Sequence, residues 1–154
     1  MQLRLGKKGE ILPIASSQIA HAVEAFIKDG GLVPGTDRNG FKLRTARAIT
    51  AATVLNQGGD FWYVRENGIL LAYCLSEFGR DQAGHPAYLF NQAWLSPDIR
   101  NKGLLRKWFY EICDYARYHG ANKIVLLSSH NPLAYCRLLG LKKRKFMTLI
   151  EEEI

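Results

Sequence analysis

The spacing of apolar positions changes along the chain, and these changes separate helices from strands. Residues 18–28 carry apolar side chains at helical spacing, and an alanine-rich second helix is expected at 43–55. The clearest helix is 104–119, where a continuous apolar stripe ends just before Gly120, a residue suited to a C-terminal cap. A further short helix is predicted at 132–139.

Strand patterns occupy the middle of the chain. Residues 61–65 and 69–78 flank Asn67-Gly68, a dipeptide typical of tight β-hairpins. Residues 88–95 form a third strand pattern, and the apolar run within 123–128 is typical of a strand buried in a sheet.

The two ends of the chain are less distinct. One short strand is expected at 2–5 or at 11–14, and a last alternating strand at 145–151. The order of elements predicts an α+β or mixed α/β fold on one central sheet. The length, 154 residues, predicts a single domain spanning 1–154.

Composition excludes several classes of protein. With 47% hydrophobic and 23% charged residues, the chain is not expected to be disordered, collagen-like or a coiled coil. The longest apolar run, about 69–75, is far shorter than the roughly 18 residues that a membrane span needs. Glu10 and Gln18 interrupt the only stretch that resembles a signal peptide.

The three cysteines, Cys74, Cys113 and Cys136, are widely spaced and odd in number. They predict neither a disulfide framework nor a zinc site, and no metal is expected. Reduced thiols and a cytoplasmic location are the simplest interpretation.

The formal net charge is +7, and the basic excess is concentrated at 100–107 and at 142–145. Such a surface suits a ligand that carries phosphate, either a nucleotide cofactor or nucleic acid. A solvated basic face without a ligand is the alternative.

One segment joins these patterns into a possible site. The strand 88–95 leads through Ser96–Ile99 into a helix that opens with Arg100–Arg106. The first N–H groups of a helix lack intrahelical partners and its N-terminus is positive, so such an end binds phosphate well. Gly103 would let a pyrophosphate approach the backbone closely. An ordinary turn with basic surface residues is the alternative.

At these residues the chain resembles the GNAT N-acetyltransferases. Residues 95–105 are similar to the family's acetyl-CoA signature, in which a strand ending in V-x-P precedes Q/R-x-x-G-x-G/A. Residues 131–141 are similar to its N-x-x-A…Y-x-x-L-G-F element. The resemblance covers about residues 60–150.

The resemblance implies a splayed central mixed sheet flanked by helices, with a reduced C-terminal hairpin. It implies direct transfer of an acetyl group from acetyl-CoA to a primary amine, on a small molecule or a protein. No specific nucleic acid and no membrane partner are implied, and the protein would be a monomer or homodimer. The implied cofactor-binding residues are Ala93, Trp94, Leu95, Arg100, Asn101, Lys102, Gly103, Leu104, Leu105 and Asn131.

Departures from the family pattern affect the expected chemistry. Leu105 replaces a small residue, and its side chain could crowd the pyrophosphate. Cys136 stands at the position of the family's tyrosine, with Tyr135 one residue earlier, so either could be the acid that protonates the thiolate. Glu77 is the nearest carboxylate for a general base. A GNAT-like module that has lost catalysis and binds CoA, a protein or nucleic acid is the alternative to an enzyme.

Overall fold

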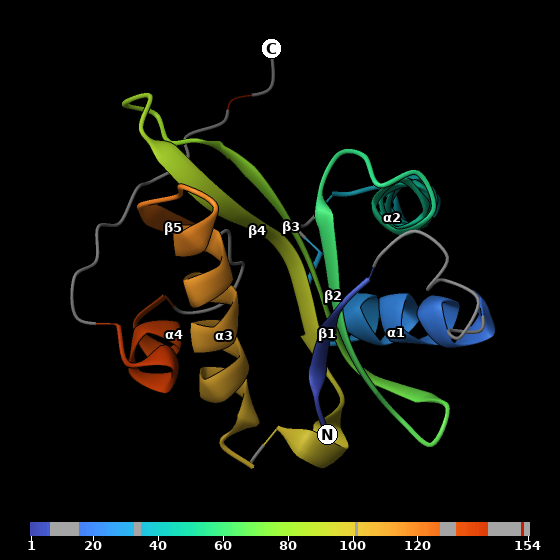
Figure 1. Cartoon of the computed structure of the whole chain (residues 1–154). Helices are drawn as coiled ribbons and strands as arrows, with labels where there is room; N and C mark the ends of the chain where they lie inside the picture. Colours follow the sequence, from blue (N-terminus) through green and yellow to red (C-terminus); the bar gives the residue numbers. More distant parts are fainter. Residues whose placement is uncertain (7–15, 33–34, 101, 127–131, 142–151, 153–154) are drawn as a thin grey trace.

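The described residues form a five-stranded sheet with helices on both faces (Figure 1). The structure, a computed structural model, describes residues 1–6, 16–32, 35–100, 102–126, 132–141 and 152. The elements in chain order are β1 (Leu3–Leu5), α1 (Ser16–Lys28), α2 (Arg38–Thr53), β2 (Asp60–Glu66), β3 (Ile69–Arg80), β4 (Pro86–Leu95), the 3-10 turn η1 (Pro97–Ile99), α3 (Leu104–Tyr118), β5 (Lys123–Leu126) and α4 (Pro132–Leu139).

The sheet follows chain order, β1-β2-β3-β4-β5. The first four strands are antiparallel, and β5 runs parallel to β4 from the pair Ala87–Lys123 to the pair Phe90–Leu126. β4 continues to Leu95, so within the described residues its second half has a partner only on the β3 side. This is the splay that the resemblance implied.

Local sequence explains most of the element boundaries. Asn67 and Gly68 both take a positive φ, 51° and 77°, as the turn of the β2–β3 hairpin requires. α2 begins five residues before the expected position. The side chain of Asp37 caps it by accepting a hydrogen bond from the N–H of Gly40 at 3.1 Å. β1 confirms the strand expected at 2–5.

Three expectations lie outside the described residues: the alternative strand at 11–14, the final strand at 145–151 and the reduced C-terminal hairpin. None of the helices in the described part of the chain is long and apolar enough to span a membrane.

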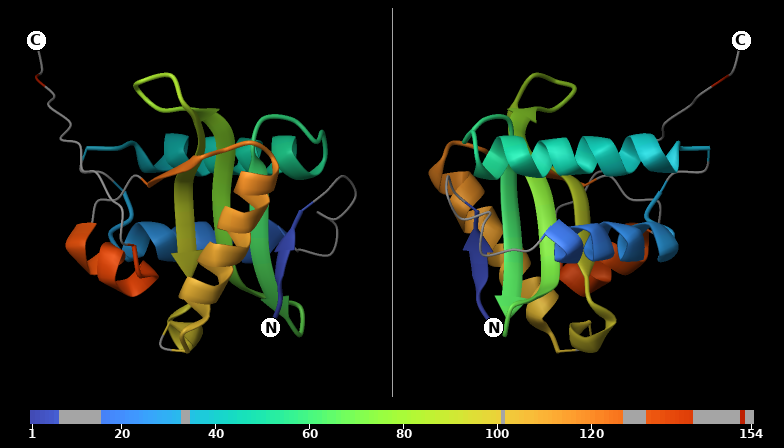
Figure 2. Two further views of the ribbon diagram at one scale, coloured as in Figure 1. Left: turned by 60° about the vertical axis from the view of Figure 1, so that its left-hand side comes forward. Right: turned by 90° about the vertical axis from the view of Figure 1, so that its right-hand side faces the viewer.

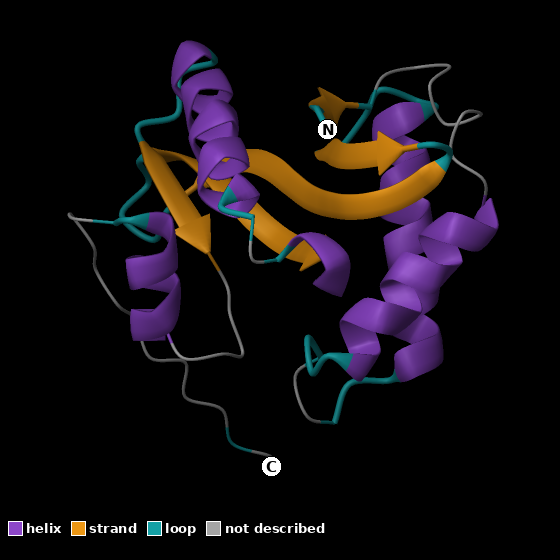
Figure 3. Ribbon diagram, turned by 90° about the horizontal axis from the view of Figure 1, so that it is seen from below, coloured by secondary structure: helices purple, strands orange, loops and turns teal. Residues whose placement is uncertain are grey.

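Helices cover both faces of the sheet, as the view from below shows (Figure 3), and each face has its own core. On one face α1 and α2 cover a cluster that includes Ile49, Phe61 and Trp94. On the other face α3 and α4 cover a cluster that includes Tyr88 and Phe109. Away from the β-bulges, neighbouring side chains along a strand therefore belong to different sides of the molecule.

Candidate active-site edge and cofactor turn

The second half of β4, whose outer edge is open within the described residues, is the first part of the candidate site. The N–H of Ser96 donates to the carbonyl of Leu71 at 2.8 Å, and the residues of such bonded antiparallel pairs recur at every second position. The N–H of Trp94 therefore faces β3, whereas the N–H groups of Ala93 and Leu95 face the open edge. Of the implied cofactor-binding residues Ala93 and Trp94, only Ala93 can donate its backbone N–H to a group at this edge.

The turn after β4 opens a helix whose N-terminus carries no side-chain cap. Gly103 lies at the start of α3 with φ 68° and ψ 5°, a left-handed conformation that favours glycine. A Cβ at this position would meet no atom within 4 Å, so the space above the backbone is open. Lys102 is exposed beside it, and Asn101 lies outside the described residues. The first N–H groups of α3 are therefore positioned to receive an anion.

Two arginines of this region bind the protein itself. Arg100 donates from Nε to the carbonyl of Leu95 at 3.0 Å, and its guanidinium pairs with Asp29, which follows α1. Arg106 donates to the carbonyls of Leu138 at 3.0 Å and Arg137 at 2.9 Å, at the C-terminal end of α4. Both join the turn to another element, a role that their place in the signature does not indicate.

The unusual Leu105 is accommodated by packing. Its side chain is half-buried and packs against the cluster beneath α3 and α4, which includes Phe109 and Leu139. Leu104 packs in the same way against a neighbouring cluster that includes Ile99 and Trp108. The bulk of Leu105 thus joins the core.

A β-bulge lies next to the last described pair of β4 and β5, Phe90 with Leu126. Leu75 pairs with Gln92 and Ser76 with Phe90, so Asn91 is one extra residue in β4. Its side-chain Nδ2 donates to Oε1 of Glu77 at 3.1 Å. The bulge thus places an amide and a carboxylate together at the branch point of the sheet, on the face that α1 and α2 cover.

A second polar group lies beside the bulge under α2. Thr45 Oγ1 donates to Oε1 of Gln92 at 3.2 Å, and Nε2 of Gln92 donates to the hydroxyl of Tyr73. Burial raises the pKa of Tyr73, so its hydroxyl stays protonated at neutral pH. Nearby, Nε1 of Trp94 is buried with no hydrogen-bond partner in the described part of the chain.

The sequence analysis missed Asn91, Gln92, Thr45 and Tyr73. Two consecutive polar residues, Asn91 and Gln92, interrupt an otherwise apolar strand. This interruption of the period of two is a signal that predicts a bulge.

The structure describes only some of the site residues expected in and just before α4. Cys136 is buried, at 6% exposure, which matches a packing position. The side chain of Tyr135 and all of Asn131 lie outside the described residues. Burial raises the pKa of the Cys113 thiol on α3 to about 11, so that thiol is protonated at neutral pH.

The far end of β4 carries two polar networks, both distant along the strand from the turn. The buried hydroxyl of Tyr88 accepts from Trp62 Nε1 at 2.9 Å and from Ser76 Oγ at 2.8 Å, and it donates to Asp60 at 2.6 Å. These bonds tie β2, β3 and β4 together in the core.

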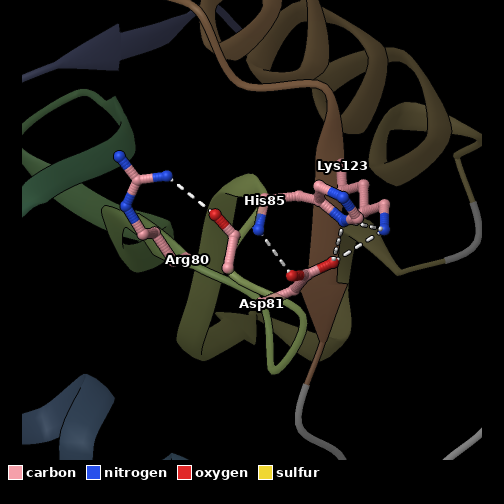
Figure 4. A network of polar contacts seen from close by, with 5 residues as sticks. Arg80, Asp81, His85 and Lys123 are labelled. Atoms are coloured by element: carbon pink, nitrogen blue, oxygen red, sulfur yellow. Dashed lines mark hydrogen bonds and ion pairs between the residues drawn. The ribbon is translucent and has the colours of Figure 1, made fainter.

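The second network lies on the surface and clamps β5 to the β3–β4 hairpin (Figure 4). The carboxylate of Asp81 accepts from Lys123 Nζ at 2.7 Å and from the N–H of His85 at 2.8 Å. No group of three or more His, Cys, Asp or Glu side chains in the described residues could hold a metal ion.

Comparisons with solved structures identify this arrangement. A predicted acetyltransferase from Clostridium acetobutylicum, solved with acetyl-CoA, superposes with a TM-score of 0.69 at 15% identity, over 97% of this chain and 95% of that one. The chain has the GNAT N-acetyltransferase fold. The five-stranded mixed sheet and its four helices thus belong to a known architecture.

Two further GNAT structures span nearly the whole chain. An aminoglycoside 6'-N-acetyltransferase from Acinetobacter haemolyticus has a TM-score of 0.66 at 8% identity and covers 100% of this chain and 99% of that one. A glucosamine-6-phosphate N-acetyltransferase from Arabidopsis thaliana has a TM-score of 0.60 at 13% identity, with coverages of 99% and 100%. A scan against family models and a search of curated proteins found no match.

Proposed function

We propose that the protein is an N-acyltransferase that moves an acetyl group from acetyl-CoA to a primary amine. The observation that carries the proposal is the open edge of β4, which leads directly into the uncapped N-terminus of α3. An extended pantetheine arm needs free backbone donors along a strand, and a pyrophosphate needs N–H groups at a helix start. Ala93 and Gly103 supply these two features in one continuous segment.

The residues present fit acetyl-CoA on two independent counts. Ala93 is exposed although it lies within the sheet, and the space above Gly103 is open. The first turn of α3 contains no acidic residue that would repel a phosphate. Lys102 adds a positive charge beside Gly103. The bound group would supply an activated acyl thioester, and the N–H of Ala93 is a donor for its carbonyl oxygen.

Glu77 is the proposed general base. An alkyl ammonium has a pKa of about 10.4, so a proton must leave the amine before it can attack. The Glu77 carboxylate is half-exposed, lies at the branch point of the sheet, and is oriented by the Asn91 amide at 3.1 Å. It can take the proton directly or through one water.

The proton donor to the departing thiolate is proposed on α4. Tyr135 and Cys136 remain the two candidates, and the burial of Cys136 favours Tyr135. A near-parental turnover in both Tyr135→Phe and Cys136→Ala would leave α4 with a packing role.

A binding module without catalysis is the second candidate. The observation in its favour is that Arg100 and Arg106 already bind protein groups, so fewer cations face the expected phosphate position. Titration calorimetry with acetyl-CoA distinguishes the two candidates. Micromolar binding supports the transferase, and no binding at millimolar acetyl-CoA contradicts it.

The role of Glu77 has its own test. Glu77→Gln keeps the shape and the contact with Asn91 but removes the base, so turnover should fall by about 10²-fold or more while acetyl-CoA binding persists. Glu66→Gln, an exposed residue at the end of β2, is the matched control and should retain turnover. Equal turnover in the two variants would rule out Glu77 as the base.

A further inference from the structure

Helix α2 is strongly basic, and most of its charge has no ion-pair partner among the described residues. It contains Arg38, Lys42, Arg44 and Arg47 and no acidic residue. Lys42 forms an ion pair with Glu24 of α1. The three arginines are exposed, and within the described residues they take part in no ion pair. They contrast with Arg100 and Arg106, which both bind protein groups.

The placement of α2 brings its first turns to the open edge of the sheet. The Thr45–Gln92 hydrogen bond sets the middle of α2 over β4. At the other end, Thr53 lies against Gly6 and Phe61, over β1 and β2. The N-terminal turns of α2 therefore project beyond β4, as both views of Figure 2 show.

Helical geometry assigns each arginine a direction. Arg38 precedes Thr45 by seven residues, so it shares the sheet-facing side of α2 and lies about 10 Å further along the axis. Arg44 is adjacent to Thr45, about 100° around the helix. Arg47 is about 200° from Thr45 and points away from the sheet. Arg38 thus lies on the side of the sheet that carries Glu77, and the guanidinium of Arg44 lies against Gly40 in the first turns of α2, as the Asp37 carboxylate does.

The acidic groups on this side are already engaged. Glu24 pairs with Lys42, and Asp29 pairs with Arg100. Asp37 caps α2 through the N–H of Gly40. Glu77, which accepts from Asn91, is the proposed base. The charge left unpaired on this side, in the described residues, is therefore that of the α2 arginines, which disfavours a polycationic acceptor and favours one that carries a negative group.

We propose that the acceptor carries, in addition to its amine, an anionic group that Arg38 and Arg44 bind. The anionic group is a carboxylate or a phosphate, since a guanidinium can donate two parallel hydrogen bonds to either. The amine would then lie toward Glu77 and the anionic group toward the first turns of α2. This inference rests on the proposed transferase activity for the amine, but the anion site can be tested by itself.

Pairs of acceptors that differ only in the anionic group test the inference. One pair is an amino sugar and its phosphate ester, and the other is an amino acid and its amide. We expect kcat/KM for the anionic member of one pair to exceed that of its neutral partner by at least tenfold. The pair that shows the difference identifies phosphate or carboxylate as the group.

Charge-neutral variants locate the anion site. Arg38→Gln and Arg44→Gln should each raise KM for the anionic acceptor by about tenfold, with kcat and the KM for acetyl-CoA unchanged. Arg47→Gln removes the same charge from the opposite face of α2 and is the matched control. An equal effect in Arg38→Gln and Arg47→Gln would reduce the role of these charges to a general surface potential and overturn the inference.

A binding measurement separates the inference from the proposed function. The anionic acceptor should raise the melting temperature of the parent protein but not that of Arg38→Gln, with or without acetyl-CoA. Equal or better transfer to neutral or polycationic amines would overturn the inference and leave the transferase intact. If acetyl-CoA does not bind, the transferase proposal fails, and the melting shift alone decides whether the arginine site exists. Nanomolar duplex DNA binding that depends equally on Arg38 and Arg47 would overturn it in favour of a nucleic-acid face.

Discussion

The arginines of the α3 turn and those of α2 have opposite environments. Arg100 and Arg106 lie at the expected phosphate site, yet each donates to protein oxygens and joins two elements. Arg38 and Arg44 lie on a helix for which the sequence indicated no site, and they have no protein anion as partner in the described residues. A cation that matches a signature can therefore be structural, and one outside it can be available to a ligand.

The two groups of arginines should therefore contribute differently: the engaged ones to folding stability, and the unengaged ones to ligand binding. Replacing an engaged arginine leaves carbonyl or carboxylate oxygens without donors, and this lowers the free energy of unfolding. Replacing an unengaged arginine removes no intramolecular bond, so unfolding should change by less than about 0.5 kcal/mol. At the α3 turn an anion would depend mainly on backbone N–H groups, and this makes Gly103 the most sensitive position.

The largest expected effect is at that glycine. Gly103→Glu places a side chain and a negative charge where the phosphates would lie, and it should weaken acetyl-CoA binding at least tenfold, about 1.4 kcal/mol. Gly84→Glu is the matched control, because Gly84 also has a positive φ, 83°, with no atom within 4 Å of a Cβ. Calorimetry on both variants checks the prediction. Equal affinities would show that the turn does not bind the cofactor.

The next largest effect is expected at Arg106, an engaged arginine, and it is a loss of folding stability. Arg106→Ala removes two donors from the C-terminal carbonyls of α4, so the free energy of unfolding should fall by about 1 to 2 kcal/mol. Arg38→Ala is the comparison and should leave stability within about 0.5 kcal/mol of the parent. Urea denaturation measures both. A loss of the same size in Arg38→Ala would break the distinction between engaged and unengaged arginines.

A smaller effect is expected at the Arg100–Asp29 pair. Both side chains are about two-fifths exposed, at 42% and 40%, so solvent and salt screen the pair. Asp29→Asn should lower the free energy of unfolding by less than about 1 kcal/mol, and added salt should reduce the difference. Thermal melts at low and high ionic strength would show this. A salt-independent loss would indicate a structural role for Asp29 beyond the ion pair.

The smallest effect is expected at the ion pair of Lys123 with Asp81, and it appears as a dependence of thermal stability on pH. The hydrogen bond from Lys123, followed by that from the N–H of His85, lowers the pKa of Asp81 below its usual range. Stabilisation by this carboxylate is therefore present above the unfolded pKa of about 3.9 and is lost as the pH falls through the lower folded value. Asp81→Asn should melt below the parent at pH 7, and the gap should narrow in acid. A gap that is as large at pH 2 as at pH 7 would contradict this.

Local sequence was sufficient to predict most helices and strands and the turn before α3. The helical stripe before Gly120, the Asn67-Gly68 hairpin and the placement of Gly103 after a strand depend on residues close together in the chain. The start of α2 was placed five residues too late, because the helix begins at Arg38 and includes Gly40. The cap by Asp37, which accepts from the N–H of Gly40, stabilises this earlier start.

The sequence by itself thus determined the order of elements, the GNAT resemblance and the segment from β4 into α3, because periodicity and turn chemistry are local properties of the backbone. Only the tertiary structure decided which charges are free. Asp29 meets Arg100 across 71 positions, Arg106 meets the end of α4, and Thr45 sets α2 over Gln92. Such partners follow from strand register and helix placement, which depend on the packing of both cores at once.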